Sequence, residues 1–274
     1  MKKLISTLPL VILMAIGCMN EKPPVFAVLG DYTPYNYFPE KLSGRVEKMT
    51  EKNYWSIPDG ETFKKGNPIT KKELDSLTWT PDFEVVFDNN GDLITCTAIN
   101  VNGEPVYKNE LLKENNVFKE RKYFKNDTLR MYDKIKCDEK GRPLEMTCFN
   151  AVTDTLLLKY TIAYNSKGDT IGYHYFSNKG VYTGKYNNVY NDLDQCVKYE
   201  LFDRNGIYEM GGEVLYNEKG KVSKRIFYDK DKKITLEDEF TYKYDNKGNW
   251  IIAYYKDNTN HISSILERTY TYFE

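Results

Sequence analysis

The sequence Tyr244-Asp245-Asn246-Lys247-Gly248 carries the residue types of a tight chain reversal. An Asp or Asn side chain at the first turn position accepts hydrogen bonds from backbone N–H groups, two polar residues follow, and Gly adopts the left-handed angles that close the turn. The flanking segments 240–244 and 250–255 are rich in aromatic and β-branched residues and have the length of strands. This sequence therefore predicts a β-hairpin.

The same pattern occurs seven times between residues 87 and 274, with a second turn signal twelve residues after each copy. Steps between copies are 25, 25, 27, 26, 26 and 28 residues, and such a nearly fixed period is typical of a repeat array. Twelve residues hold a strand and a turn but no helix of useful length. The copies end at Gly91, Asn116, Gly141, Gly168, Asp194, Gly220 and Gly248.

Aromatic residues recur at equivalent places in these units, and cross-strand aromatic pairs stabilise a sheet. The low overall hydrophobicity argues against a thick two-layer core. We therefore expect an all-β fold, an elongated and twisted antiparallel meander of about 14 to 16 strands from seven or eight hairpins. The residues leave open whether this sheet curls into a closed barrel.

Residues 1–17 predict a lipoprotein signal peptide, because Lys2 and Lys3 precede an apolar stretch that is too short to span a bilayer comfortably. The junction Ala15-Ile16-Gly17-Cys18 resembles the lipobox of bacterial lipoproteins. By that resemblance, Cys18 becomes the first mature residue and carries acyl chains that anchor the protein to a membrane. Met19, which is not Asp, favours transfer to the outer membrane. We expect a lipid-anchored protein of the bacterial cell envelope, with the face of the membrane left open.

Two further segments precede the repeats. Residues 18–40 hold four of the ten prolines and predict a flexible tether. Residues 41–82 predict an atypical first unit that caps the array, with a strand pair and a short helix. That helix begins at the capping box 70–73 and continues through 74–77. The repeat array itself is expected to cover residues 83–274.

The hexapeptide Y-D-N-K-G-N at 244–249 resembles the YD repeat of RHS-type proteins, and more closely the small bacterial lipoproteins built from the same hairpins. The resemblance covers about residues 83–274. It implies an array of β-hairpins, and it implies no particular activity, because in large relatives these hairpins form a wall around another domain.

The residues predict no cofactor, no metal site and no enzymatic activity. His174 and His261 have no metal ligands at suitable spacing, and no known nucleophile, phosphate-binding or dinucleotide-binding motif occurs. Glu237-Asp238-Glu239 offers paired carboxylates for glycoside hydrolysis, but a solvated strand is the simpler interpretation.

A net charge of −1 with interspersed signs gives no reason to expect nucleic acid. We expect the cysteines of the body to replace apolar strand residues, with their disulfide status open: Cys96, Cys137, Cys148 and Cys196.

Exposed aromatic residues on a sheet can stack on sugar rings or anchor a protein partner. The candidate binding residues are Tyr54, Trp55, Trp79 and Trp250. The leading hypothesis is a lipid-anchored, non-catalytic envelope scaffold that binds a protein or a glycan. The alternative is a structural spacer that self-assembles through exposed sheet edges, and a third reading is a glycan-active enzyme. The oligomeric state stays open.

Overall fold

The computed structural model describes residues 42–274, apart from 60–61, 70–81, 101, 116, 167, 169, 194 and 258–261. Its described residues form seventeen strands in one sheet and no helix. The strands are β1 (Val46–Asp59), β2 (Thr62–Pro68), β3 (Asp82–Phe87), β4 (Leu93–Ile99), β5 (Pro105–Glu114), β6 (Val117–Lys125), β7 (Thr128–Cys137), β8 (Pro143–Asn150), β9 (Leu156–Tyr164), β10 (Thr170–Ser177), β11 (Tyr182–Tyr190), β12 (Cys196–Asp203), β13 (Tyr208–Tyr216), β14 (Val222–Tyr228), β15 (Ile234–Tyr244), β16 (Trp250–Asp257) and β17 (Ile262–Tyr272).

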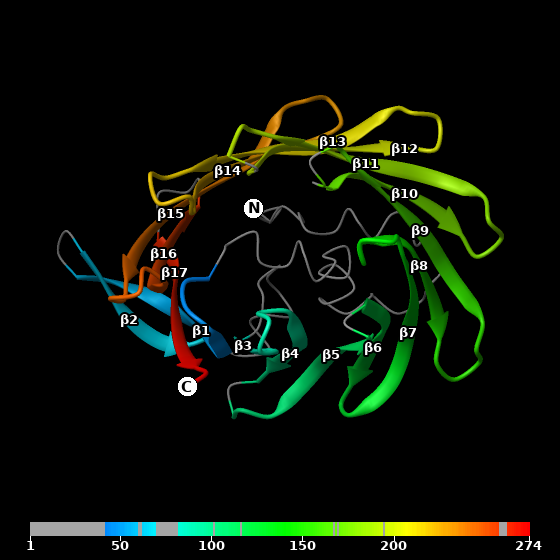
Figure 1. The fold of residues 1–274 in the computed structure, drawn as a ribbon. Helices are drawn as coiled ribbons and strands as arrows, with labels where there is room; N and C mark the ends of the chain where they lie inside the picture. The colour runs from blue at the N-terminus through cyan, green and yellow to red at the C-terminus, as the bar shows by residue number, and fades with distance from the viewer. Residues whose placement is uncertain are drawn as a thin grey trace.

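The sheet closes on itself. Strands β3 to β17 follow one another, each antiparallel to the next, and β1 pairs with β17 on one edge and with β3 on the other. Together, β1 and β3 to β17 form a closed antiparallel barrel of sixteen strands, which Figure 1 shows as a complete ring. The remaining strand, β2, folds back on β1 as a hairpin beside the ring.

The expected elongated meander is therefore wrong. The sequence correctly indicates strands and antiparallel neighbours, but the two ends of the array meet through β1 instead of lying far apart. β1 is one strand of fourteen residues, where a pair of shorter strands is expected, and it joins two edges instead of covering one end. The expected helix at 70–77 lies outside the described residues, as do the signal peptide at 1–17 and the tether at 18–40.

The Asp or Asn side chains of the repeat hold the turns as the sequence indicates. Asp88 Oδ1 accepts hydrogen bonds from the backbone N–H groups of Asn90 and Asp92, both at 2.9 Å, and Gly91 has a φ of 84°. The same pair of bonds recurs at Asn100, Asp138, Asn191, Asp203, Asn217, Asp229 and Asp245.

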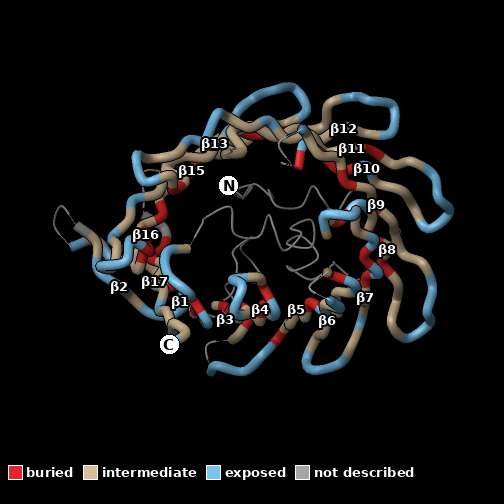
Figure 2. The backbone as a smooth tube through the Cα atoms, in the orientation of Figure 1, coloured by how far each residue is buried: buried red, intermediate tan, exposed pale blue. Residues whose placement is uncertain are grey.

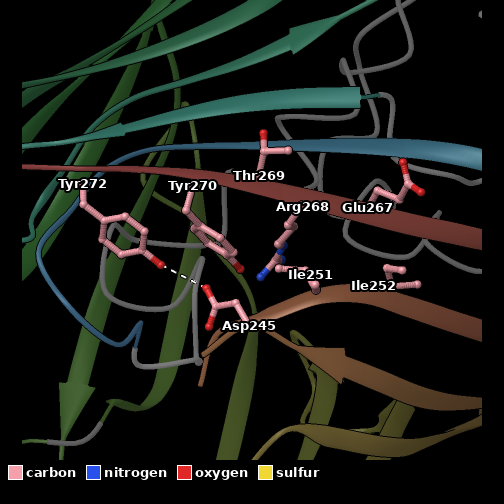
Figure 3. Close-up of a pocket in the computed structure, with 8 residues that line it drawn as sticks. All are labelled: Asp245, Ile251, Ile252, Glu267, Arg268, Thr269, Tyr270 and Tyr272. Carbon is pink, nitrogen blue, oxygen red and sulfur yellow. Dashed lines mark hydrogen bonds between the residues drawn. The ribbon is translucent and has the colours of Figure 1, made fainter. Parts of the chain in front are cut away.

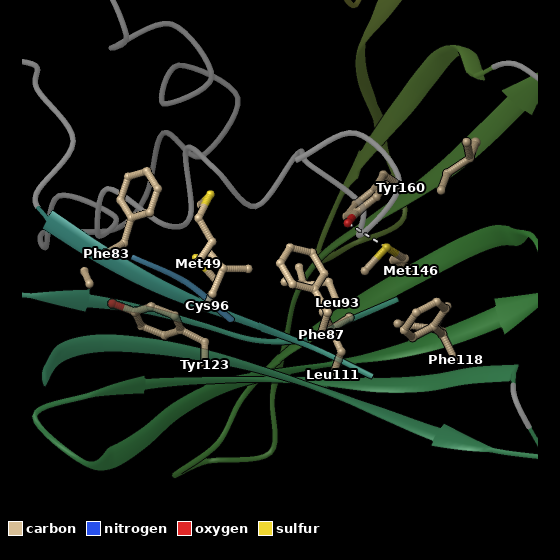
Figure 4. Packing of buried hydrophobic residues seen from close by; sticks show 14 of the residues in the cluster. Met49, Phe83, Phe87, Leu93, Cys96, Leu111, Phe118, Tyr123, Met146 and Tyr160 are labelled. Atoms are coloured by element: carbon tan, nitrogen blue, oxygen red, sulfur yellow. Dashed lines mark hydrogen bonds between the residues drawn. The ribbon is translucent and has the colours of Figure 1, made fainter. Parts of the chain in front are cut away.

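The two faces of the wall differ in chemistry. In β3 the side chains of Phe83, Val85 and Phe87 are buried, and the residues between them are more exposed. Buried apolar residues of β1 and β3 to β10 form one cluster, and Figure 4 shows them converging from different strands, as side chains on the concave face of a closed sheet do. Figure 2 shows how burial alternates along the strands. The inner face is therefore largely apolar, with ion pairs such as Arg121 with Asp133 and Arg268 with Glu51 set into it.

The outer face carries charged side chains paired across strands. Lys159 lies 2.7 Å from Glu145, and Lys224 lies 3.2 Å from Glu237. Lys48 and Glu84 pair in the same way between β1 and β3. Charged residues thus occupy the middle of the outer wall as well as its turns.

Side-chain hydrogen-bond donors recur at the place where the ladder between an even-numbered strand and the odd-numbered strand after it ends. There the carbonyl at the start of the even strand has no partner in the ladder, and a donor on the following strand bonds to it. Tyr164 and Tyr216, which directly precede turns, are two of these donors. The donor and acceptor residues are Cys137 and Phe118, Tyr164 and Pro143, Asn188 and Thr170, Tyr216 and Cys196, Tyr242 and Val222, and Tyr270 and Trp250.

Closure can be tested at Glu51, whose carboxylate pairs with Arg268 across β1 and β17 at 2.7 Å. Both side chains are buried, at 3% and 9% exposure. Removing one partner of a buried ion pair costs about 3–5 kcal/mol, so Glu51→Ala should lower the free energy of unfolding by about that amount. Lys48→Ala is the control on the same strand, and its exposed outer pair is worth about 0–1 kcal/mol. Urea unfolding measures both, and equal small losses would contradict a closed seam.

The Asp residues at the turns make the stability of the fold depend on pH. Backbone N–H groups hold the pKa of Asp138 and of Asp203 below its ordinary value. A lowered folded-state pKa adds stability above the unfolded pKa of about 4, and this stability is lost as the pH falls through the folded pKa. The double variant Asp138→Asn and Asp203→Asn should keep the turns, as Asn does at 191 and 217, and unfold with a smaller difference between pH 6 and pH 2. An unchanged difference in urea titrations would refute this account.

Candidate binding surface inside the barrel

A row of aromatic rings crosses the inner face from β10 to β16. Centroid distances between neighbours are 6.0 Å for Tyr173 and Tyr186, 5.7 Å for Tyr186 and Tyr199, 6.4 Å for Tyr199 and Phe227, and 5.3 Å for Phe240 and Tyr255. We call these six residues the aromatic row. Tyr173 and Tyr255 are buried at its ends, and the four rings between them are half-buried.

Gly212 makes this row continuous across β13. It pairs with Tyr199 on one side and with Phe227 on the other. A Cβ atom at Gly212 would lie 2.5 Å from the Tyr199 hydroxyl and 2.8 Å from the carbonyl oxygen of Ile226. Because glycine leaves this space free, the Tyr199 ring reaches across the strand and contacts Phe227 edge-on.

Arg225 fills the remaining step of the row. Its guanidinium lies 5.5 Å from the Phe227 centroid and 4.9 Å from the Phe240 centroid. It also donates a 2.7 Å hydrogen bond to Asp238, whose other carboxylate oxygen accepts a hydrogen bond from the Tyr255 hydroxyl. Asp238 therefore neutralises Arg225, and the row presents rings and hydroxyl groups with no net charge.

The carboxylates of Glu237-Asp238-Glu239 do not converge. Asp238 is on the inner face, opposite Arg225 in the ladder, whereas Glu237 and Glu239 point outward and pair with Lys224 at 3.2 and 3.8 Å. A pair of glycosidase carboxylates must flank one bond from the same side of the wall. These residues are therefore not arranged for glycoside hydrolysis.

A shallow hollow of about 420 Å³ lies where β16 and β17 part (Figure 3). Side chains of the wall bridge it, because the Tyr272 hydroxyl donates to Asp245 at 3.1 Å and the Tyr270 hydroxyl donates to the carbonyl of Trp250 at 2.8 Å. The Arg268 guanidinium covers the Trp250 ring at 3.7 Å from its centroid. The hollow is thus part of the repeated strand junction, and we do not take it as a ligand site.

The structure separates the candidate binding residues. Trp250 is buried at 4% exposure and belongs to the packing of the wall. Tyr54 points outward under Lys65, whose Nζ lies 4.4 Å from its ring, and burial raises the pKa of the Tyr54 phenol. Trp55 is half-buried on the inner side, opposite Ser264. Trp79 and the lipidation residue Cys18 lie outside the described residues.

The cysteines and the metal-binding residue types form no centre in the described part of the chain. Cys96, Cys137, Cys148 and Cys196 are all free thiols, and burial raises the pKa of Cys148 well above its ordinary value. Among the described residues, no three His, Cys, Asp or Glu side chains are grouped to hold a metal ion. No described helix is long and apolar enough to cross a membrane.

Sequence reasoning missed the aromatic row, because Tyr recurs in every unit and no single copy stands out. The available signal is Gly211-Gly212 in the middle of a strand segment, since an interior strand glycine often marks close approach of another group. Gly212 points to Tyr199 and Phe227 only once the ladder register is known.

Comparison with known proteins identifies a fold and no family. No family model and no curated protein sequence matches this chain. The crystal structure of a porin-like protein from Bacteroides uniformis is similar, with a TM-score of 0.54 and 10% identity over 84% of this chain and 98% of that one. A porin-like protein from Bacteroides vulgatus gives a TM-score of 0.45 and 12% identity over 83% of this chain and 99% of that one. At such identity, the first likeness shows the fold alone.

The expected membership of the YD-repeat, RHS-like group is therefore wrong. The similarity above a TM-score of 0.5 is to a porin-like protein. The short motif Y-D-N-K-G-N identifies a turn between strands, as the hydrogen bonds at Asp245 show, and many unrelated sheets need such a turn.

Proposed function

We propose that this chain is a non-catalytic protein of the bacterial cell envelope, lipid-anchored through Cys18, and that its barrel binds a glycan. The aromatic row on the inner face is the observation that carries the binding proposal. The anchor rests on the sequence at 15–18. The outer membrane is the proposed location, from the residue that follows Cys18.

The outer wall supports anchoring by lipid instead of by insertion of the barrel. A barrel that spans a bilayer carries an apolar outward band about 25 Å tall, and Lys at its midplane costs about 2–4 kcal/mol. Here Lys and Glu pairs such as Lys159 with Glu145 and Lys224 with Glu237 lie on the outer face in mid-strand. This wall suits water on the outside, and a separate anchor would then hold the protein at the membrane.

The inner wall favours a glycan over a folded protein partner. A chain of sugar units is narrow and can follow a concave surface enclosed by the ring. Sugar rings have apolar C–H faces and polar hydroxyl edges, which match Tyr rings that pack while their hydroxyls bond to polar groups. Edge-to-edge self-assembly has less support, because closure through β1 leaves the sixteen ring strands without a free edge.

The anchor is tested by Cys18→Ser. The full chain should sediment with membranes and acquire label from a radioactive fatty acid, whereas the variant should do neither. The physical reason is that each buried methylene of an acyl chain contributes about 0.8 kcal/mol to membrane binding. Cys196→Ser is the control, because that thiol lies in the wall, and it should keep both label and sedimentation. A Cys18→Ser protein that still carries the label would exclude the anchor.

Glycan binding is tested at Tyr199. The full lipidated protein in detergent is titrated by calorimetry with a panel of neutral and anionic polysaccharides. Tyr199→Ala should weaken binding about tenfold or more, equivalent to about 1.4 kcal/mol, through loss of the central ring of the row. Phe202→Ala is the matched control, because Phe202 is a half-buried aromatic on the same strand with its side chain on the outer face. Equal effects of the two variants, or no binding by the unaltered protein, would overturn the proposal.

A further inference from the structure

The ion pairs of the inner face differ in how far solvent reaches them. The pairs Arg121 with Asp133 and Arg268 with Glu51 are closed off, with all four side chains at most 13% exposed. In the third pair, between β14 and β15, the Asp238 side chain is 2% exposed and the Arg225 side chain is 40% exposed. Of these three guanidinium groups, that of Arg225 is by far the most accessible from the interior of the ring.

Two rings and a buried carboxylate hold Arg225 in place. Its guanidinium lies between Phe227 and Phe240, at 5.5 and 4.9 Å from their centroids. Its Nη2 atom donates to Asp238 at 2.7 Å, and Asp238 in turn accepts from the Tyr255 hydroxyl. Because the wall already orders this side chain, a ligand that bonds to it pays little further conformational entropy.

Arg225 adjoins the half-buried rings at the centre of the aromatic row. Phe227 follows it by two residues on β14, so both side chains are on the inner face, and Phe227 meets Tyr199 at 6.4 Å. A ligand that packs on Phe227 and Tyr199 therefore lies beside the guanidinium.

The chemistry of this pair favours a neutral ligand with hydroxyl groups. A guanidinium presents N–H donors in a planar fork and has no acceptor. Its exposed part bonds to water, which hydroxyl oxygens of a ligand can replace. A ligand carboxylate would share the guanidinium with Asp238 and repel that carboxylate, which is fixed behind it.

We propose that Arg225 donates hydrogen bonds to the hydroxyl groups of a neutral saccharide whose ring packs on Phe227 and Tyr199. This inference rests on the proposed glycan binding and adds the ligand class and the residue that recognises its polar edge. The rings contact the apolar face of any sugar alike, whereas Arg225 distinguishes sugars by where their hydroxyls lie. Arg225 is thus the specificity-determining residue of the row.

The test uses Arg225→Lys in the full lipidated protein in detergent. Lysine keeps a positive charge beside Asp238 but lacks the planar fork of donors. Calorimetric titration with a neutral glucan, a mannan and a galactan measures affinity, and urea unfolding without glycan measures stability. Arg225→Lys should weaken binding of the preferred polysaccharide about tenfold. Lys224→Arg is the matched control, because Lys224 is the adjacent residue and pairs with Glu237 and Glu239 on the outer face, and it should leave affinity unchanged.

A second variant covers the case in which Arg225→Lys lowers the unfolding midpoint. Arg225→Met combined with Asp238→Asn removes both charges together, so no buried carboxylate is left unpaired, and methionine still packs against the two rings. This double variant should fold and should bind the neutral polysaccharide at least about tenfold more weakly, as the loss of charged hydrogen bonds requires.

The charge class is tested with polygalacturonate at increasing salt concentration. Binding of a neutral glycan through Arg225 should change little with salt, since no net charge is neutralised, whereas binding of an anion should weaken steeply. Binding of polygalacturonate alone, with that steep salt dependence, would overturn the neutral class.

The outcomes separate this inference from the function on which it rests. If the unaltered protein binds a glycan through Tyr199, and the folded Arg225 variants bind it equally well, Arg225 serves only the wall and the inference is overturned while glycan binding stands. Equal losses in Arg225→Lys and Lys224→Arg would also overturn it. Absence of any glycan binding overturns both proposals together.

Discussion

The pairing of β1 with two partners is the constraint on which the rest of this structure depends. A sheet edge presents unpaired N–H and C=O groups, and fifteen successive strands from β3 to β17 leave two such edges. β1 satisfies both, with Glu51 buried against Arg268 on one side and Met49 opposite Val85 on the other. Because the ring is closed, one face of every strand becomes interior. The apolar cluster gathers on that inner face, and charged residues on it are held in ion pairs such as Glu51 with Arg268.

The repeated units contain hydrogen-bonding side chains that an isolated hairpin would not need. The Asx side chain fixes each turn, but the turn leaves the carbonyl at the start of the next strand outside the ladder. Tyr216, Tyr242 and Tyr270 supply hydroxyl donors to these carbonyls, and Asn188 supplies an amide donor in the same place. The recurring element is therefore an Asx turn together with a side-chain hydrogen-bond donor on the adjacent strand. This explains a period held near 26 residues without identical residues in each unit.

The sequence is informative about local structure and less so about shape. Turn residues such as Asp245 and Gly248 act within five residues, so strand order and the positions of reversal can be inferred from them. Closure depends on Glu51 meeting Arg268, more than two hundred residues away, and no local pattern encodes that contact. The candidate binding surface likewise depends on contacts that no local sequence pattern encodes. Trp was the conspicuous candidate, yet Trp250 is packed into the wall, and the row depends on Gly212, a residue with no side chain.

The fold alone does not decide what the barrel does, because function lies in the residues that line its faces. A ring of sixteen strands is wider than its own wall side chains can fill, since eight strands already make an interior that side chains just occupy. A membrane pore of this size keeps polar groups inside and apolar groups outside. Here Val85 and Met146 lie inside together with ion pairs such as Arg225 and Asp238, and Lys159 lies outside, so the wall does not show this separation. The half-buried rings in the middle of the aromatic row, beside the paired Arg225, favour an occupant with both apolar ring faces and hydroxyl groups.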